Sequence, residues 1–471
     1  MTAADKKMTL RVQASHRHMS LAFLIVWLVL VGFGLLMMFS ASYGISFVQS
    51  SAEIRSQLTE SGALDANSPV RAVLAADASA LARKQAAYTL LGTIAAVTLG
   101  AVIPFRQLTR PVFPWLVYTL LLGSLIYCRL FGLSLNGARR WVSLGFVTFQ
   151  PSELAKVGGV FFLASYLSRR RRLRARDKAR PEGQRKSLAS QAFKDVTWPA
   201  MLMMVLVVLI LIQPHLSGAV ILTLITVTVF LLADIPWKSM AAGLVQLLVI
   251  VLVAALLFSA GYQMLTKKSA TDFIGDRFAH VFRRVGTFQD RDTASDDDRM
   301  QIEQAELALG SGGLTGKGLG KSVQKLNWLS EAHNDFILPV IGEELGFIGV
   351  SAVILLFLAF LAAGIMVARR ASTHMGMLIA AGNTILIVLQ AFLNMAVAAS
   401  LIPTTGISLP FFSYGGTANI FFALAAGMVL CVSKSGVATD PEIARIVDRG
   451  QRKKARGKKT VEEDDSMRYA V

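Results

Sequence analysis

Glu153 and Lys156 stand three positions apart within 149–167, a stretch that is otherwise mostly apolar. Pro151 and Ser152 come just before them, which predicts a helix that begins at about this point with Ser152 as its cap. Side chains three positions apart lie on the same helix face, so this carboxylate and this ammonium can meet. Charged groups inside a membrane are costly, and a functional site is their default interpretation. A purely structural ion bridge is the alternative.

Arg139, Arg140 and Trp141 precede this predicted helix. Arginine and tryptophan are common at the depth of lipid headgroups, so an anchor at the membrane surface is one interpretation. A guanidinium also matches pyrophosphate oxygens in a bidentate geometry, so contact with a phosphate group is the other. The residue types alone leave both interpretations open.

An acidic cluster lies in a long polar segment, with a helix predicted behind it over 301–309. The cluster and the glutamine that follows it are Asp290, Asp292, Asp296, Asp297, Asp298 and Gln301. A carboxylate can take the proton of a hydroxyl nucleophile, and carboxylates also bind divalent cations such as Mg²⁺ or Mn²⁺. A general base, a cation site and a merely solvated acidic loop are therefore all compatible with this pattern.

Two further stretches are rich in glycine or proline. The first, 310–320, superficially resembles a phosphate-binding loop but lacks the spacing of that motif. The second, 403–416, carries two prolines and three glycines between apolar blocks, which breaks a helix at membrane depth. Irregular backbone is tolerated there only against protein or a cavity, so the segment is either a cavity wall or a structural re-entrant turn.

The elements that must position these residues are membrane helices. The chain has 471 residues, of which 54% are hydrophobic and 17% charged, whereas soluble domains are nearer 25% charged. Its net charge of +18 resides mainly in loops and tails, which indicates an anionic membrane face rather than nucleic acid as the partner. Cys128 and Cys431 both fall in apolar blocks, and two cysteines build neither a disulfide framework nor a zinc site.

We predict an all-α, polytopic membrane protein with about ten transmembrane helices. Continuous apolar runs of about twenty residues match the roughly 30 Å hydrocarbon core, and the absence of alternation argues against a barrel. The predicted spans are 21–42, 86–103, 111–128, 149–167, 196–213, 218–233, 240–260, 346–368, 376–398 and 415–433. Together they form one membrane domain over 21–433.

Basic residues predict the orientation of this domain. The loop 168–195 holds ten Lys and Arg between positions 169 and 186, and the arm 1–20 and the charged tail 434–471, predicted to be disordered, are basic too. The positive-inside rule then places both termini in the cytoplasm. Two long segments, 43–85 and 261–334, become extracytoplasmic loops, the second between helices 7 and 8. The arginines before the Glu153 helix fall outside, against the rule, which calls for a functional explanation.

The motifs resemble the SEDS family (shape, elongation, division and sporulation), whose members include FtsW, RodA and SpoVE. The resemblance runs from about residue 21 to 433 and is carried by the segments 136–141, 150–156, 318–324, 331–346 and 403–416. The resemblance implies a peptidoglycan glycosyltransferase that polymerises lipid II. In that reaction the GlcNAc 4-hydroxyl attacks the anomeric carbon of a MurNAc, and undecaprenyl pyrophosphate leaves with inversion.

The resemblance also implies which residues act. Glu153 and Lys156 match the family's membrane-embedded pair, and Arg139, Arg140 and Trp141 would shape the mouth of the cavity. Gln301, in the outer loop, and four residues of the signature segments are also expected to bind substrate or support the site: His333, Asn334, Ser413 and Tyr414.

The sequence departs from the family at the expected catalytic aspartate. Relatives carry Asp-Pro shortly before Tyr-Gln, whereas here Met300 precedes Gln301 and an ungapped alignment puts Ala294 and Ser295 at the Asp-Pro position. We therefore assign the base to a neighbouring carboxylate among Asp296, Asp297 and Asp298, favouring the last two. A second departure is His215, which stands where many relatives have aspartate.

The stretch 320–326 is more similar to FtsW than to RodA, which implies a role in cell division. The expected location is the bacterial cytoplasmic membrane, at the division septum. The expected partners are a class B penicillin-binding protein, whose transpeptidase crosslinks the new strand, and other divisome membrane proteins. A lipid II flippase, or a divisome scaffold without catalysis, is the alternative to the polymerase.

Overall fold

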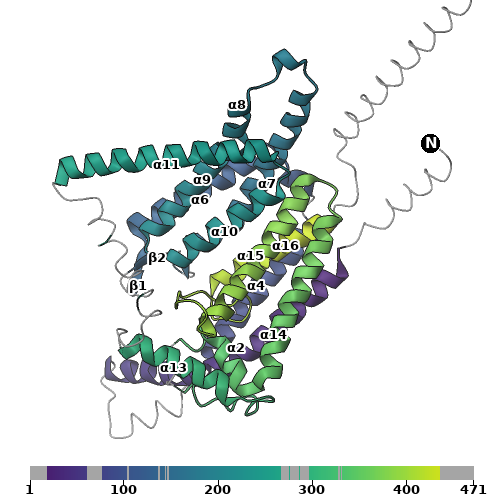
Figure 1. Ribbon diagram of the computed structural model, residues 1–471. Helices are drawn as coiled ribbons and strands as arrows, with labels where there is room; N and C mark the ends of the chain where they lie inside the picture. Colours follow the sequence, from purple (N-terminus) through teal and green to yellow (C-terminus); the bar gives the residue numbers. More distant parts are fainter. Residues whose placement is uncertain are drawn as a thin grey trace, which may run out of the picture.

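The computed structural model describes residues 19–60, 77–102, 105–135, 138–143, 148–266, 296–326 and 331–434, with single residues at 145, 275, 286 and 329. These fold almost entirely into helices, shown in Figure 1. The helices are α2 (Leu21–Glu60), α4 (Ala80–Val102), α5 (Phe105–Leu108), α6 (Phe113–Phe131), α7 (Pro151–Lys178), α8 (Leu188–Ala192), α9 (Trp198–Ile212), α10 (Leu216–Leu232), α11 (Trp237–Thr266), α13 (Asp296–Ser311), α14 (Ile337–Arg369), α15 (His374–Ala398) and α16 (Thr417–Lys434). A 3-10 turn (Glu182–Gln184) precedes α8, and a π-helical turn (Phe193–Thr197) joins α8 to α9.

Every predicted span contains a helix, and the all-α membrane class is confirmed. In the described part, eight helical segments are long and apolar enough to cross a membrane. They include α8 and α9 as one continuous segment, Leu188–Ile212. The other two predicted spans correspond to α10, which is apolar but only 17 residues long, and to α7, which carries a charged pair at one end and arginines at the other. The total of ten spans stays a prediction.

Several helices extend beyond the spans that hydropathy marks. Helix α2 continues to Glu60, α7 continues to Lys178, and α14 begins at Ile337 rather than at position 346. The expected loops 43–85 and 168–195 are therefore helical over much of their described length. The extensions of α2 and α7 contain polar residues, which lower the local hydropathy without ending the helix.

Helix α15 is the centre of the bundle. In the most apolar stretch of α15, 72% of the residues are buried. The helix packs against α7, α10, α14 and α16. Helices α2 and α4 enclose α16 from the other side. By contrast, only 6% of the residues in the most apolar stretch of α11 are buried, and Figure 1 shows this helix extending away from the bundle. Its exposed leucines and valines suit contact with lipid tails.

A small antiparallel sheet, which the sequence did not predict, connects α6 to α7. Strand β2 (Ala138–Ser143) lies between β1 (Leu133–Leu135) and β3 (Thr148–Phe149). Leu133 pairs with Trp141, and Val142 pairs with Phe149. The sheet holds the arginine-containing strand β2 next to the start of α7. Polar side chains of this strand therefore lie close to the start of that helix.

The described molecule has two distinct ends, visible in Figure 1. We call the end that contains α8 and the second half of α7 the basic end, because the arginines of 169–176 lie there. The opposite end contains α13, the small sheet and the irregular segment 399–416, and we call it the cavity end.

Candidate active site

A polar cavity of about 610 Å³ opens at the cavity end. Its wall comes from β2, the first turns of α7 and α10, helix α13, the segment before α14, helix α15 and the irregular segment that precedes α16. The polar residues that line it are Arg140, Trp141, Gln150, Glu153, Lys156, His215, Ser217, Gln301, Glu331, Asn334, Asp335, Gln390, Thr404, Ser408 and Tyr414.

Glu153 and Lys156 form the ion pair that their spacing predicts. Lys156 Nζ lies 2.8 Å from Glu153 Oε2, and the two side chains are only 2% and 7% exposed. Lys156 Nζ also donates a hydrogen bond to Gln390 Oε1 at 2.5 Å, and it lies 5.7 Å from the centre of the Phe422 ring. Gln390 in turn donates to the Ser408 carbonyl at 3.3 Å. The pair thereby connects α7 to α15 and to the irregular segment.

Ser152 does not cap α7, contrary to the prediction. The capping position is Gln150, which makes no side-chain capping bond. Instead, Ser152 Oγ and Gln150 Nε2 lie 3.0 Å and 3.2 Å from Nδ1 of His215, which lies between α9 and α10. Burial, together with the positive charges of Arg140 and Lys156, lowers the pKa of His215 to about 3. The imidazole is therefore neutral and accepts hydrogen bonds from this helix start.

Two neighbouring arginines of β2 have different surroundings. Arg140 lines the cavity and donates a hydrogen bond to the Pro214 carbonyl. Arg139 is exposed, donates to the Leu130 carbonyl at 3.4 Å and does not line the cavity. Of the two arginines predicted to shape the cavity mouth, only Arg140 lines the cavity. Trp141, the third residue of that prediction, lines it as well.

Helix α13 carries the predicted base region to the cavity. Gln301 lines the cavity, and α13 begins at Asp296, so the backbone of Asp297 and Asp298 belongs to the turn that precedes Gln301. The side chains of Asp296, Asp297 and Asp298 lie outside the described residues, as do Asp290 and Asp292. The identity of the base stays a prediction.

The segment 331–336 brings two further carboxylates to the cavity. Glu331, Asn334 and Asp335 all line it, and Asn334 Nδ2 donates a hydrogen bond to Glu331 Oε2. Asn394 of α15 fixes this segment, since its Nδ2 donates to the carbonyls of Asp335 at 2.8 Å and Ile407 at 2.6 Å.

Among the residues expected from the resemblance, His333 and Ser413 support the wall rather than line it. The His333 ring is buried, which lowers its pKa, and its carbonyl accepts a bond from the Tyr414 amide at 2.8 Å. Ser413 Oγ accepts a bond from the Leu409 amide at 2.7 Å and so closes a turn. Tyr414 itself reaches the cavity.

Sequence reasoning did not single out Gln390 or Asp335 as site residues. Gln390 lies 234 positions from Lys156, and nothing in its own apolar stretch indicates that partner. Asp335 stands in a polar segment from which only His333 and Asn334 were predicted to belong to the site. His215 was noted only as a departure from the family pattern.

The glycine-rich stretch is anchored beside α13 by two buried acids of α14. Glu343 Oε1 lies 2.7 Å from Lys317 Nζ, and Glu344 Oε1 lies 2.6 Å from Lys325 Nζ. Both carboxylates are fully buried, and Ser40 of α2 donates to Glu344 at 2.7 Å. Because none of these five residues lines the cavity, the network positions the segment 312–326 rather than touching a substrate.

The described residues contain no group of three or more His, Cys, Asp or Glu side chains that could hold a metal ion. Magnesium, however, is commonly held by one or two carboxylates together with substrate phosphates. Glu331, Asn334 and Asp335 supply oxygen donors of that type in the cavity wall. The donor set therefore fits a cation shared with a phosphorylated substrate.

An apolar groove of about 780 Å³ follows α6 toward the cavity end. It is lined along α6 from Val112 to Tyr127 and ends at Val142 and Phe149 of the small sheet. Their chain neighbours Trp141 and Gln150 line the polar cavity. The groove therefore ends at the small sheet that also forms part of the cavity wall.

The fold and the site define a multi-span membrane protein with a buried ion pair in a polar cavity at one end of the bundle. The FtsW/RodA/SpoVE cell cycle protein family matches residues 64–437, and the chain belongs to this family. A probable peptidoglycan glycosyltransferase FtsW of Geobacter sp. (strain M18) is 34% identical over 74% of this chain and 86% of its own length. Another, from Thioalkalivibrio sulfidiphilus, is 31% identical over 93% and 94% of the two chains.

Solved structures agree on the fold. A chain of a peptidoglycan synthase complex, described as coordinating polymerization and crosslinking, is 25% identical with a TM-score of 0.54 over 83% of this chain and 98% of its own. The rod shape determining protein RodA of Thermus thermophilus has a TM-score of 0.54 at 24% identity, over 89% and 97% of the two chains, and shares the fold.

Proposed function

We propose that this protein is a peptidoglycan glycosyltransferase that polymerises lipid II. The observation that carries the proposal is the polar cavity, with its buried Glu153–Lys156 pair and Arg140, at the end of an apolar groove. Lipid II joins a long polyprenyl tail to a pyrophosphate and a disaccharide. The groove suits the tail, and the cavity suits the charged and hydroxylated parts.

The reaction needs a base, a positioned acceptor and charge stabilisation for the leaving group. The GlcNAc 4-hydroxyl of one substrate attacks the anomeric carbon of the MurNAc of the other, and the bond from that carbon to the pyrophosphate oxygen breaks. A carboxylate of the Asp296–Asp298 region takes the hydroxyl proton, and Gln301 orients the acceptor. Arg140 and Lys156 offset the negative charge on the departing undecaprenyl pyrophosphate.

A divalent cation, Mg²⁺ or Mn²⁺, is part of the proposal. Glu331, Asn334 and Asp335 would hold it, and it would supply charge neutralisation for the pyrophosphate. The test measures lipid II polymerisation before and after chelation of divalent cations. Cation binding is measured separately by calorimetry. We expect chelation to abolish polymerisation and Mg²⁺ to restore it, and Asp335→Asn to weaken cation binding.

The proposed location is the bacterial cytoplasmic membrane at the division septum, with the basic end in the cytoplasm and the cavity end outside. The ten Lys and Arg of 169–186 support this orientation. The proposed partners are a class B penicillin-binding protein and other divisome membrane proteins. Similarity to a chain of a synthase complex that couples polymerization to crosslinking supports the first of them.

The deciding experiment mixes the purified protein and its penicillin-binding protein partner with lipid II in liposomes. We expect glycan strands longer than a disaccharide, with undecaprenyl pyrophosphate released in equal measure to the bonds formed. Translocation of lipid II across the bilayer without any polymer would instead support a flippase. Neither activity would support a scaffold role.

A further inference from the structure

His215 lines the polar cavity but has no part in the proposed reaction. The residue is 8% exposed and stands between α9 and α10. Its ring lies over the first turn of α10, because a methyl group added at Gly218 would lie 2.6 Å from Cε1 and from Nδ1 of the imidazole. The glycine at position 218 therefore leaves the space that the ring occupies.

The hydrogen bonds of the imidazole show which of its nitrogens carries the proton. Gln150 Nε2 lies 3.2 Å from Nδ1 and is a donor, so Nδ1 accepts. The hydroxyl of Ser152, at 3.0 Å, donates to the same nitrogen. In the neutral ring the proton then resides on Nε2. Within the described part of the chain Nε2 has no hydrogen-bond partner, and it is not among the polar atoms sealed from solvent without one. Its N–H is therefore open to the cavity.

The surroundings of the ring favour an anionic partner for this N–H. Burial and the positive charges of Arg140 and Lys156 lower the pKa of His215 to about 3, so the imidazole is neutral near pH 7. A hydrogen bond from a neutral donor to an ionised acceptor is stronger than one to a neutral acceptor. An ionised oxygen is thus the acceptor that suits this position.

The start of α10 adds to this preference. His215 is the capping position of that helix and makes no side-chain capping bond, so the cap leaves the first amides of the helix without its help. Ser217 and Gly218, in the first turn, line the same cavity. A helix start carries a partial positive charge and commonly binds phosphate groups. The imidazole N–H and the first turn of α10 therefore face the same space.

We propose that His215 is a substrate-binding residue whose Nε2 donates a hydrogen bond to a pyrophosphate oxygen of the lipid-linked substrate. The first turn of α10 lies against the same group, whereas the sugar hydroxyls, which are neutral, lie elsewhere in the cavity. Gln150 and Ser152 are positioning residues, because their bonds to Nδ1 fix the proton on Nε2. The inference rests on the proposed function and assigns one wall of the cavity to one part of the substrate.

The test measures the binding of two lipids to the full-length protein in detergent micelles by microscale thermophoresis. Undecaprenyl pyrophosphate and undecaprenol share the same tail and differ in the pyrophosphate. The variant His215→Leu removes the N–H, and His215→Gln keeps an amide N–H at a similar reach. A third variant, His374→Leu, is the control.

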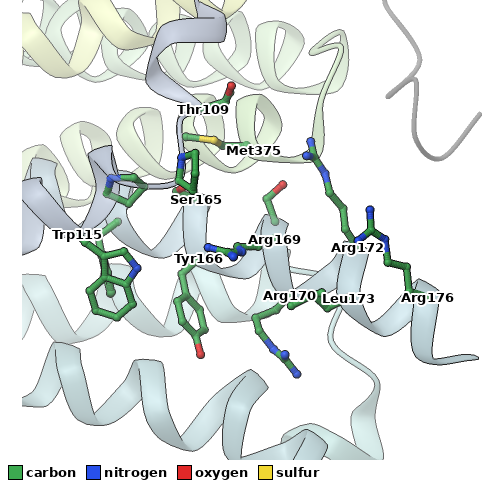
Figure 2. A pocket seen from close by; sticks show the side chains of 14 residues that line it. Thr109, Trp115, Ser165, Tyr166, Arg169, Arg170, Arg172, Leu173, Arg176 and Met375 are labelled. Carbon is green, nitrogen blue, oxygen red and sulfur yellow. The ribbon is translucent and has the colours of Figure 1, made fainter. Parts of the chain in front are cut away.

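His374 matches His215 in burial but lies at the basic end. The two residues are 9% and 8% exposed. His374 begins α15, and Gln390 on the wall of the polar cavity follows it by 16 positions, which is roughly 24 Å along a helix. Figure 2 shows the next residue, Met375, on the wall of another cavity, of about 550 Å³. Both leucine variants thus lose a buried imidazole, but only His215→Leu changes the polar cavity.

We expect His215→Leu to bind undecaprenyl pyrophosphate on the order of 10- to 100-fold more weakly, because a hydrogen bond to an ionised group is lost. Its affinity for undecaprenol should not change, His215→Gln should retain most of the affinity for the pyrophosphate, and His374→Leu should alter neither lipid. Equal weakening of both lipids by His215→Leu, no weakening of either, or the same loss in His374→Leu would overturn the proposal.

Thermal unfolding and size-exclusion profiles show whether His215→Leu remains folded. If it does not, His215→Glu and His215→Gln decide, because these side chains have the same shape and only the glutamine has an N–H to donate. We expect the glutamate variant to bind undecaprenyl pyrophosphate about 10-fold more weakly than the glutamine variant, or weaker still. Equal affinities would overturn the proposal.

Polymerisation of lipid II by the natural protein is measured in parallel. The predicted difference in binding without any polymer would refute the polymerase and leave a site for a pyrophosphate lipid. Polymerisation with equal binding in all His215 variants would refute only the role of His215.

Discussion

The Glu153–Lys156 pair is held away from bulk water in the wall of the polar cavity. Both side chains are almost fully buried, and Gln390 is a third polar partner. A buried ion pair contributes little to stability compared with apolar residues of the same size, but a single buried charge is very unfavourable. The proposed role of the pair, to place charged groups in the cavity, accounts for a buried ion pair that adds little stability.

Removing one partner, or both, distinguishes the contribution of the pair to stability from its contribution to activity. We expect Lys156→Met to lower the free energy of unfolding by about 3–5 kcal/mol, because it leaves the Glu153 carboxylate buried and uncompensated. The double variant Glu153→Gln with Lys156→Met should recover most of that loss in a thermal unfolding assay, yet remain inactive in polymerisation. Recovery of activity together with stability would show that the pair is only structural.

His215 gives the folded protein a dependence on acid. Its pKa is about 3 in the folded state and about 6.5 in an unfolded chain, so protonation favours unfolding. Stability is therefore complete above about pH 6.5 and falls by roughly 1.4 kcal/mol per pH unit as the pH decreases toward 3. Between pH 7.5 and 5 this amounts to about 2 kcal/mol.

The variant His215→Gln should not show this part of the acid sensitivity. Thermal unfolding in detergent at pH 7.5 and at pH 5 measures it in both proteins. The same difference between the two pH values in variant and natural protein would contradict a buried, neutral imidazole.

At the scale of elements, helix α13 and the glycine-rich segment behind it depend on α14. Gly346 interrupts α14 with a φ of 64°, which only glycine adopts easily. A methyl group there would lie 2.4 Å from the Gly316 nitrogen and 2.6 Å from the Leu314 carbonyl carbon. The kink is thus the place where the 312–318 backbone packs against the helix.

We expect Gly346→Ala to lower the free energy of unfolding by roughly 3 kcal/mol, from overpacking and left-handed strain together. It should also lower polymerisation, because α13 precedes this segment and carries Gln301 to the cavity. Gly32→Ala in α2 is the control, since no atom lies within 4 Å of its added methyl group. It should be neutral or stabilise by up to about 1 kcal/mol; similar losses in both variants would refute the packing argument.

Elements could be predicted from the sequence where one local pattern determines them. Apolar runs located stretches that each contain a helix, and the spacing of Glu153 and Lys156 predicted their contact. The extension of α2 to Glu60 was not predicted, because the second half of this helix is polar. The capping role predicted for Ser152 was wrong, because its side chain contacts His215, which is distant in the sequence. Contacts such as Lys156 to Gln390 join distant helices, so no local pattern contains them.

At the scale of the whole molecule, the two ends differ in what they offer. One end presents arginines on α7, and the other presents the polar cavity, which α13 helps to line. The proposed orientation places the arginines against the anionic cytoplasmic leaflet and the cavity where new cell wall is made.

Single cysteines test this orientation. Gly183 and Gly310 are exposed at the basic and cavity ends, and an added side chain meets no atom within 4 Å at either. We expect a membrane-impermeant maleimide to label Gly310→Cys in intact spheroplasts, and Gly183→Cys only after lysis. The native Cys128 and Cys431 are buried and give little background. The reverse pattern of labelling would invert the proposed topology.

In the proposed reaction, an aspartate at the start of α13 activates the acceptor hydroxyl in this cavity. The most direct test measures lipid II polymerisation by Asp296→Ala, Asp297→Ala, Asp298→Ala and the triple variant, each with the penicillin-binding protein partner. Glu303→Ala, on the same helix but in an exposed ion pair with Arg299, is the control. We predict that Asp297→Ala or Asp298→Ala, and the triple variant, lose at least 100-fold in rate while remaining folded, with Glu303→Ala unaffected. Full activity in the triple variant would contradict the account.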